Sequence, residues 1–283
     1  MALAANRKAL VAVDLGAQSC RVSLLRWNRN EPEIEVLHRF SNAPISTPDG
    51  LCWDIDAIFE GLIEGLQSCA ACASEGIASV AVDGWAVDYV RLNSKGDPVS
   101  FPFCYRDPRT EKAELQVHSV LPPSRLYSLT GIQILRLNTL YQLYADKLAG
   151  ADPHLPWVNL PEFITYRLSG KRVSEYTNAT HTGLVALGTP TWCQEIFREL
   201  GLDWRRRLKL SPAVRCLGPS PRNSRISLRS ETRESSFLLA TILLRPSPRF
   251  PRLATIGLLS VPGRGPWWEP FLIRLALPAT RGR

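Results

Sequence analysis

This sequence of 283 residues lacks the features of several large classes of protein. No apolar run approaches the roughly 20 residues that a membrane-spanning helix needs, and the first residues lack the apolar stretch of a secretory signal. There are seven cysteines, but the Cys69–Cys72 pair has no second pair at the spacing of a zinc site. Both fall near the end of an expected helix, which favours buried free thiols. We therefore expect a cytoplasmic protein without a membrane partner.

Lysine and aspartate are also missing from the end of the chain. Residues 217–283 contain 11 arginines and 3 glutamates, but no lysine and no aspartate. Residues 1–216 carry 23 basic and 23 acidic side chains, so the whole net charge of +8 comes from the tail. A basic tail can bind nucleic acid, but proline and apolar runs interrupt this one, which disfavours that partner. The composition predicts an irregular C-terminal tail that is mostly loop.

The most informative local pattern lies at residues 11–21. Apolar residues lead to Asp14, a tight turn follows, and a second apolar strand covers 22–27. Asp14 can hold Mg²⁺ through water, and exposed backbone N–H groups of a turn can cradle a phosphate. The turn residues predicted to contact a nucleotide phosphate are Gly16, Ala17, Gln18, Ser19 and Cys20, with Arg21 behind them. An ordinary hairpin with a charged turn is the alternative interpretation.

Hydrophobic periodicity predicts an α/β fold. A strand over 34–40, a helix over 54–71 and an apolar strand over 77–82 follow the opening hairpin. A further hairpin is expected at 87–92, with a polar turn at 93–97. The chain then becomes mostly helical, with helices expected over 110–120, 124–129, 139–148 and 161–168. No internal repeat is visible.

A series of motifs resembles the FGGY family of sugar kinases, over roughly residues 10 to 200. Within that family the series is most similar to the members that phosphorylate L-rhamnulose. The motifs are Val-Asp-Leu-Gly-x-x-Ser-x-Arg at 13–21, Trp53-Asp54-Ile55-Asp56, Val82–Asp88, Tyr105–Thr110, Thr130–Gln133, Leu137–Leu143 and Glu175–Thr180.

The resemblance implies an actin-like, ribonuclease-H-like lobe with a mixed sheet flanked by helices. Residues 1–216 would form the N-terminal, sugar-binding domain, and residues 217–283 the tail. ATP and Mg²⁺ are the implied cofactors, with Asp14 as the metal carboxylate and L-rhamnulose as the sugar partner. The sequence does not indicate an oligomeric state.

The resemblance also implies a wall of the sugar site at the end of the strand over 77–82. Trp85 can stack on a sugar and donate its indole N–H, and a neighbouring charge pair can order the wall. The residues expected to form this wall are Trp85, Ala86, Arg106, Asp107, Asn138 and Gln142. Each has an alternative: Trp85 as core, Arg106 and Asp107 as a loop ion pair, and Asn138 as a helix N-cap.

Three positions depart from the family pattern. Cys20 replaces a glycine of the phosphate turn, Ala86 replaces a glycine of the sugar wall, and Glu162 stands where the family commonly has aspartate. We expect each larger side chain to crowd the approach of a ligand to the backbone.

The likeness ends near residue 217. The family continues with a His-Asp-Thr segment, whose aspartate is the general base, and then with a nucleotide-binding lobe. Neither occurs in these 283 residues, so no catalytic base is assigned. We expect the chain by itself to be an inactive part of a kinase. A non-catalytic sugar-binding module and a nucleic-acid-binding tail are the alternatives.

We hypothesise that the tail results from a shift of reading frame. Read one frame over, Ala240–Ser247 can encode His-Asp-Thr-Ala-Ser-Ala-Val. Residues 259–269 can likewise encode Ile-Ser-Ser-Gly-Thr-Trp-Ser-Leu-Val-Gly, which resembles the next family motif. The frame would change between about residues 214 and 240.

The DNA sequence of codons 210–285 tests this hypothesis. We expect an inserted or deleted base between codons 214 and 240, after which the encoded protein continues in the family's frame. An intact reading frame on resequencing would reject the hypothesis, and the tail would then belong to the natural protein.

Overall fold

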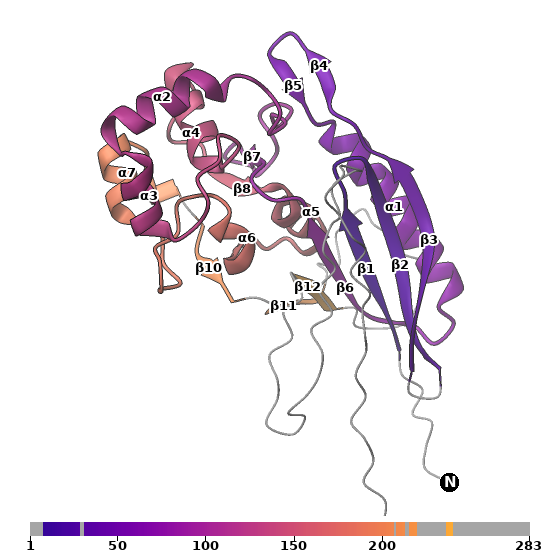
Figure 1. The fold of residues 1–283 in the computed structure, drawn as a ribbon. Helices are drawn as coiled ribbons and strands as arrows, with labels where there is room; N and C mark the ends of the chain where they lie inside the picture. Colours follow the sequence, from indigo (N-terminus) through magenta and orange to yellow (C-terminus); the bar gives the residue numbers. More distant parts are fainter. Residues whose placement is uncertain (1–7, 29–30, 207, 213–214, 220–235, 240–283) are drawn as a thin grey trace, which may run out of the picture.

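A computed structural model describes residues 8–28, 31–206, 208–212, 215–219 and 236–239. A six-stranded sheet with one long helix forms one side of the molecule, and a group of shorter helices forms the other (Figure 1). Helix α5 (Leu160–Ser169) lies between them and contacts β6 and the short strands β7 (Tyr89–Arg91) and β8 (Trp157–Asn159). The mixed α/β fold expected from the sequence is confirmed.

The sheet has the strand order β11-β12-β6-β1-β2-β3. Strand β6 runs parallel to β1 on one side and to β12 on the other. The β1–β2, β2–β3 and β11–β12 pairs are antiparallel. The bounds of the strands are β1 (Ala9–Leu15), β2 (Ser19–Asn28), β3 (Glu31–Ser41), β6 (Ile77–Gly84), β11 (Arg215–Pro219) and β12 (Ser236–Leu239).

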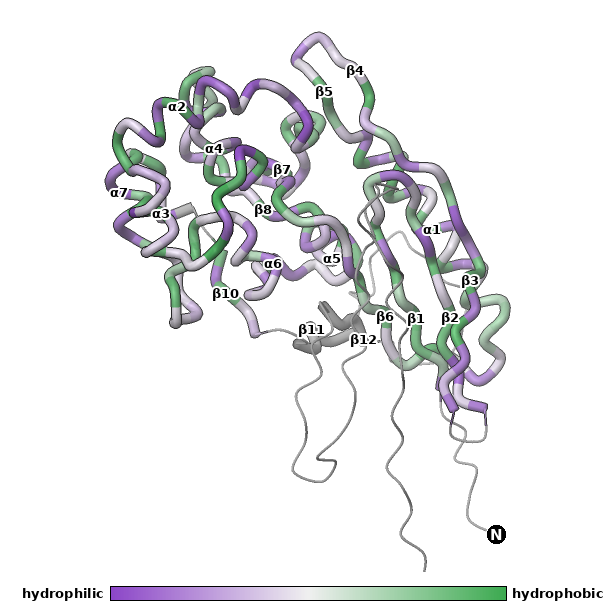
Figure 2. Tube along the Cα trace, viewed as in Figure 1, coloured by the Kyte–Doolittle hydropathy of each residue, from purple (hydrophilic) through white to green (hydrophobic). Residues whose placement is uncertain are grey.

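Helix α1 (Ile55–Cys72) covers one face of this sheet because the strands alternate in burial. Val13 pairs with Val22 on β2 and with Val82 on β6, and all three are buried. Figure 2 shows the resulting hydrophobic colour along β1, β2 and β6. The Asp54 side chain accepts a hydrogen bond of 3.0 Å from the backbone N–H of Ala57, which fixes the start of α1.

The second part of the molecule is helical and has its own core. The helices and one 3₁₀ turn are α2 (Thr110–Val120), α3 (Pro123–Thr130), α4 (Thr139–Leu148), α5 (Leu160–Ser169), α6 (Tyr176–Thr180), α7 (Gln194–Leu200) and η1 (Trp204–Arg206). The four predicted helices are confirmed within one residue at each end, whereas α6 and α7 were not predicted. Gly131 and Gly170 end α3 and α5 in the left-handed conformation, with φ of 68° and 72°.

Three short strand pairs complete the described residues. They are β4 (Ile45–Thr47) with β5 (Gly50–Cys52), β7 (Tyr89–Arg91) with β8 (Trp157–Asn159), and β9 (Ser174–Glu175) with β10 (Leu210–Ser211). The predicted hairpin at 87–92 forms only a single bridge, between Leu92 and Pro98, at its turn. The first strand of this predicted hairpin, β7, pairs instead with β8. The backbone groups of a short strand can form hydrogen bonds with a partner at either edge.

The tail enters the sheet at two places that its composition did not predict. Strands β11 and β12 lie within or next to the region expected to be loop, and β12 pairs with β6. Residues 240–247 and 259–269, which carry the frame hypothesis, lie outside the described residues.

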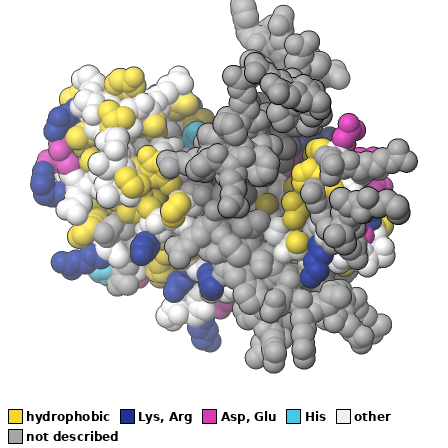
Figure 3. All heavy atoms as spheres, turned by 90° about the horizontal axis from the view of Figure 1, so that it is seen from below, with side chains coloured by type: hydrophobic (Ala, Val, Ile, Leu, Met, Phe, Trp, Pro, Cys, Tyr) yellow, Lys and Arg dark blue, Asp and Glu magenta, His cyan; other side chains and the backbone are white. Residues whose placement is uncertain are grey.

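The structure also bears on the expected burial of two cysteines and on the expected absence of a membrane-spanning helix. Cys69 is buried, but Cys72 is exposed, so the prediction that both are buried was wrong for Cys72. No helix among the described residues is long and apolar enough to cross a membrane. Seen from below, the described surface shows basic side chains interspersed with hydrophobic ones (Figure 3).

The contact of α1 with the sheet predicts a severe effect of Gly65→Ala. An added methyl group would lie 2.4 Å from Cγ2 of Val22, so α1 must move away from β2. We expect a loss of about 2 kcal/mol in the free energy of unfolding, although alanine favours helix by about 1 kcal/mol. Urea denaturation measures this. Gln67→Ala, at an exposed position of the same helix, is the control, and an equally small effect of both changes would contradict the prediction.

Candidate functional site

The predicted phosphate turn joins the end of β1 to the start of β2. A methyl group added at Gly16 would lie 2.4 Å from the carbonyl oxygen of Ser19, so only glycine fits there. Asn42 holds the turn from outside. Its side-chain amide donates to the carbonyl oxygen of Gly16 at 2.9 Å, and its backbone N–H donates to that of Gln18 at 3.0 Å.

The turn leaves donors free for a ligand. The backbone N–H groups of Ala17 and Gln18 make no hydrogen bond to any described residue. The side chain of Cys20 does not crowd them, because it is fully buried and its Sγ lies 3.8 Å from the carbonyl oxygen of Gly16. Burial raises the pKa of this thiol to about 12. The crowding expected from the change of glycine to Cys20 is therefore absent, and the donor set fits a phosphate.

Asp14, on β1 two residues before Gly16, forms an ion pair. Its Oδ2 atom is 2.7 Å from Nη1 of Arg21, its register partner on β2. Asp83 is the partner of Asp14 on β6. Burial, with a contribution from the charge of Asp14, raises the pKa of Asp83 to about 6. Mg²⁺ usually keeps several waters and takes one or two carboxylates, so these donors suit it.

The predicted sugar wall is organised around Asp88, a carboxylate with no exposed surface. Its Oδ2 atom accepts the indole N–H of Trp53 at 2.6 Å, the indole N–H of Trp85 at 2.9 Å and the backbone N–H of Tyr105 at 3.2 Å. Its Oδ1 atom accepts from the side chain of Gln142 at 3.1 Å. The indole N–H of Trp85 is therefore already used inside the protein.

Val87, between the predicted wall and Asp88, has an unusual backbone. Its φ is 75°, in the left-handed region that β-branched residues rarely adopt. Two donors hold its carbonyl oxygen: the Thr139 hydroxyl at 2.6 Å and the Gln142 side chain at 3.3 Å. Strained backbone of this kind is concentrated at ligand sites. It is thus an independent indication that residues 85–87 form a site.

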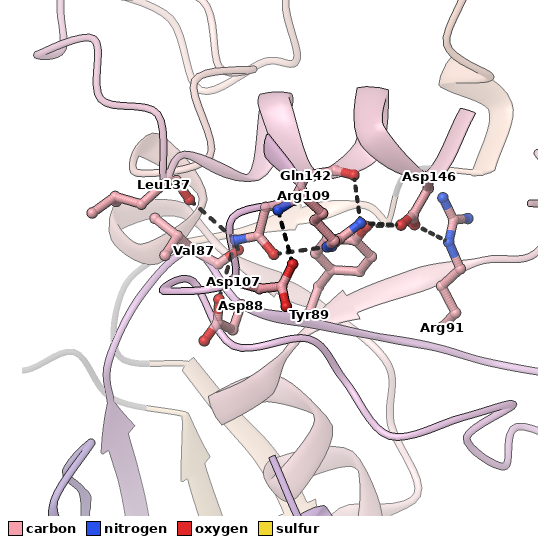
Figure 4. A network of polar contacts seen from close by, with 9 residues as sticks. All are labelled: Val87, Asp88, Tyr89, Arg91, Asp107, Arg109, Leu137, Gln142 and Asp146. Atoms are coloured by element: carbon pink, nitrogen blue, oxygen red, sulfur yellow. Dashed lines mark hydrogen bonds and ion pairs between the residues drawn. The ribbon is translucent and has the colours of Figure 1, made fainter. Parts of the chain in front are cut away.

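Gln142 connects the wall to a second buried network (Figure 4). Its side-chain nitrogen donates to the carbonyl oxygens of Val87 and Leu137 and to Asp88, and its side-chain oxygen accepts from Arg109. All its polar atoms therefore point into the protein. The structure gives it a connecting role between α4 and the wall.

The second network surrounds Asp146 on α4. Its carboxylate accepts from the Tyr89 hydroxyl at 2.5 Å and from Nε of Arg91 at 2.6 Å. Arg109 contacts the other oxygen and also donates to the carbonyl oxygen of Gln142 at 3.2 Å. Asp146 is buried, so this partly buried ion-pair network ties β7 to α4.

Three further residues of the predicted wall, Arg106, Asp107 and Asn138, contact different parts of the chain. Asp107 is buried and accepts from the backbone N–H groups of Leu51 at 2.7 Å and Arg109 at 2.9 Å. Arg106 is exposed, and its guanidinium lies 5.1 Å from the centre of the Tyr105 ring. The expected charge pair is therefore not formed among the described residues.

Asn138 lies at the N-cap of α4, but its side chain does not cap that helix. Its Oδ1 accepts from the backbone N–H of Leu135 at 2.8 Å, and its Nδ2 donates to the carbonyl oxygen of His181 at 2.9 Å. The buried Asn138 therefore ties α4 to the chain after α6.

The two remaining departures from the family pattern differ in position. Ala86 is partly exposed between the buried Trp85 and Val87. Glu162 is buried and accepts from the backbone N–H of Glu175 at 3.1 Å and from the side chain of Asn178 at 2.7 Å. Burial raises the pKa of Glu162 to about 7. Its carboxylate is used within the protein, so the expected crowding of a ligand by Glu162 is not seen.

Sequence reasoning missed the residues that connect the site. Asp88, Trp53 and Arg109 all lie within the quoted motifs, but no role was given to them. Asp146 lies outside those motifs, and no local pattern marked it. A signal for Asp88 was available, because an aspartate inside an apolar run needs buried partners.

Comparison with known proteins supports one family. The N-terminal domain of the FGGY family of carbohydrate kinases matches residues 9–217. Rhamnulokinase of Oceanobacillus iheyensis is 35% identical over 211 residues, which are 74% of this chain and 45% of that protein. Rhamnulokinase of Pectobacterium atrosepticum is 40% identical over 209 residues, which are 70% of this chain and 41% of that protein. The chain thus spans less than half the length of these relatives.

Solved structures share the fold at low identity. A xylulose kinase of Lactobacillus acidophilus has a TM-score of 0.72 at 18% identity, over 83% of this chain and 48% of that chain. A glycerol kinase of Plasmodium falciparum, determined with ADP, has a TM-score of 0.63 at 12% identity, over 76% and 45%. The fold is that of the N-terminal lobe of these kinases. The chain belongs to the FGGY family of carbohydrate kinases.

The environment of Asp88 predicts a distinctive pH dependence. Burial raises its folded pKa to about 6, above the value of about 3.9 in an unfolded chain. The folded state therefore binds the proton more tightly, and the contribution of Asp88 to stability falls as the pH rises from 4 to 6. Asp88→Asn cannot titrate. We expect its stability, relative to the parent, to improve by about 2 kcal/mol over this range.

Urea denaturation at pH 4, 5, 6 and 7 measures this difference. Asp97→Asn, the same chemical change at an exposed position, is the control for the loss of a carboxylate. A constant or falling relative stability of Asp88→Asn would contradict the raised pKa.

Proposed function

We propose that this lobe serves ATP-dependent phosphorylation of L-rhamnulose to L-rhamnulose 1-phosphate. The observation that carries the proposal is the phosphate turn: Ala17 and Gln18 offer free N–H groups directly beyond Asp14. Relatives named rhamnulokinase at 35% and 40% identity support the choice of sugar. The site residues of the proposal are those of the turn and of the wall at 85–87.

In this proposal the turn positions the phosphates and the wall positions the sugar. Phosphoryl transfer depends mainly on such positioning and on compensation of charge. Mg²⁺ and ATP, when bound, would supply the transferable phosphoryl group and neutralise its charge. Gly16 allows the close approach of the backbone, and Asp14 would hold the metal through water. At the wall, the partly exposed Ala86 lies beside the strained Val87.

Residues 1–283 contain no His-Asp-Thr segment, so we propose that they have no measurable kinase activity by themselves. A general base contributes roughly 10²–10⁴-fold to a rate. We therefore expect no L-rhamnulose-dependent release of ADP from ATP in a coupled assay of the purified chain. Detectable sugar-dependent turnover would overturn this part of the proposal and would require another base.

Sugar binding tests the wall without relying on turnover. We expect L-rhamnulose at 100 times its Kd to stabilise the chain by about 2.7 kcal/mol, seen as a rise of several degrees in the melting temperature. The larger side chain of Ala86→Leu should block the sugar site at the wall and abolish this rise. Ala57→Leu adds the same volume at an exposed position of α1 and should retain it. Failure of the parent chain to respond, or an unchanged response of Ala86→Leu, would contradict the wall assignment.

A further inference from the structure

Three charged side chains stand in a row across the sheet at the phosphate turn. The register of β1 with β2 places Arg21 beside Asp14, and the register of β1 with β6 places Asp83 on the other side. Register partners on adjacent strands project to the same face of a sheet. The row therefore holds two carboxylates and one guanidinium, and its charge is not balanced by its own members.

The ion pair in this row is accessible to solvent. Nη1 of Arg21 lies 2.7 Å from Oδ2 of Asp14, and the two side chains are 42% and 19% exposed. Within the described residues, neither side chain makes another hydrogen bond or ion pair. Exposed pairs of this kind are weak and exchange readily, in contrast to a buried, fully bonded carboxylate.

We propose that Arg21 is a resident counter-ion of Asp14, which a divalent metal ion displaces, so that the freed guanidinium can bind the phosphates that arrive with the metal. The inference rests on the proposed function and concerns how its phosphate site is regulated. Without nucleotide, Arg21 protects Asp14 from metal. With nucleotide, the same side chain changes partner from a carboxylate to a phosphate.

The geometry gives this exchange a physical basis. Mg²⁺ binds carboxylates through a shell of water, so Asp14 and Asp83 would hold it through water once Arg21 leaves. Arg21 follows the turn directly, and the free N–H groups of Ala17 and Gln18 lie on that turn. A guanidinium also binds phosphate oxygens in a bidentate manner. The exchange therefore leaves Asp14 and Arg21 each beside an opposite charge at the start and at the end.

The proposal predicts opposite effects of one substitution on two ligands. Arg21→Gln should tighten the binding of Mn²⁺, a paramagnetic substitute for Mg²⁺, by up to about fivefold, the size expected for loss of an exposed competing pair. The same change should weaken the binding of metal-free tripolyphosphate by at least about fivefold, because a charge-assisted contact is lost. Titrations of the full chain followed by electron paramagnetic resonance and by NMR of the turn amides measure both.

Three controls isolate the effect. Arg136→Gln removes an arginine of similar exposure from a pair of similar length, 2.9 Å from Glu111 on α2, and should change neither affinity. Asp14→Asn should abolish the Mn²⁺ gain when combined with Arg21→Gln. Thermal unfolding of each variant confirms that it is folded at the temperature of the titration.

Each result decides the proposal. Unchanged or weaker Mn²⁺ binding in Arg21→Gln overturns it, as does an equal gain in Arg136→Gln or a gain that persists with Asp14→Asn. Absence of Mn²⁺ binding in both the parent and Arg21→Gln also overturns it. The Mn²⁺ result does not depend on sugar, so loss of the L-rhamnulose response contradicts the proposed function and leaves this inference standing.

Discussion

The buried carboxylate of Asp88 is the interaction on which the arrangement of this lobe depends. Four donors reach it from separate parts of the chain: Trp53 before α1, Trp85 after β6, the backbone at Tyr105, and Gln142 on α4. A carboxylate without exposed surface is costly unless its hydrogen bonds are satisfied. The sheet side and the helical side therefore cannot separate without taking donors away from Asp88, and the loop at 85–87 is fixed between them.

This constraint explains how a strained residue persists at Val87. Its carbonyl oxygen is held by Thr139 and Gln142, both on α4, while the next residue is anchored from both sides. Strain of about 1–3 kcal/mol survives only where the surroundings over-determine the conformation. Here the surroundings include the Asp146 network, because Arg109 connects Gln142 to Asp146. The shape of the predicted wall is thus set by groups that do not themselves face a ligand.

Much of the fold could be predicted from the sequence, but less of the site. The strands around Val13 and Val22 and helix α1 follow from periodic burial, and periodicity is local. Gln142 and Asn138 were predicted to face a sugar because they are polar and begin a helix. In the structure their amides are used inside the protein. A sequence shows that a polar group needs partners, but not whether a ligand or a distant strand supplies them.

The same reasoning separates Asp88 from Asp14. Asp88 is fully buried and bonded by four uncharged donors, so its role is to hold structure and nothing is free to exchange. Asp14 has one charged partner, Arg21, which is 42% exposed. A buried carboxylate that loses one donor is left with a desolvated charge, whereas Asp14 can replace a guanidinium with another cation and lose little. The carboxylate suited to binding and release is therefore the one that the protein itself holds most weakly.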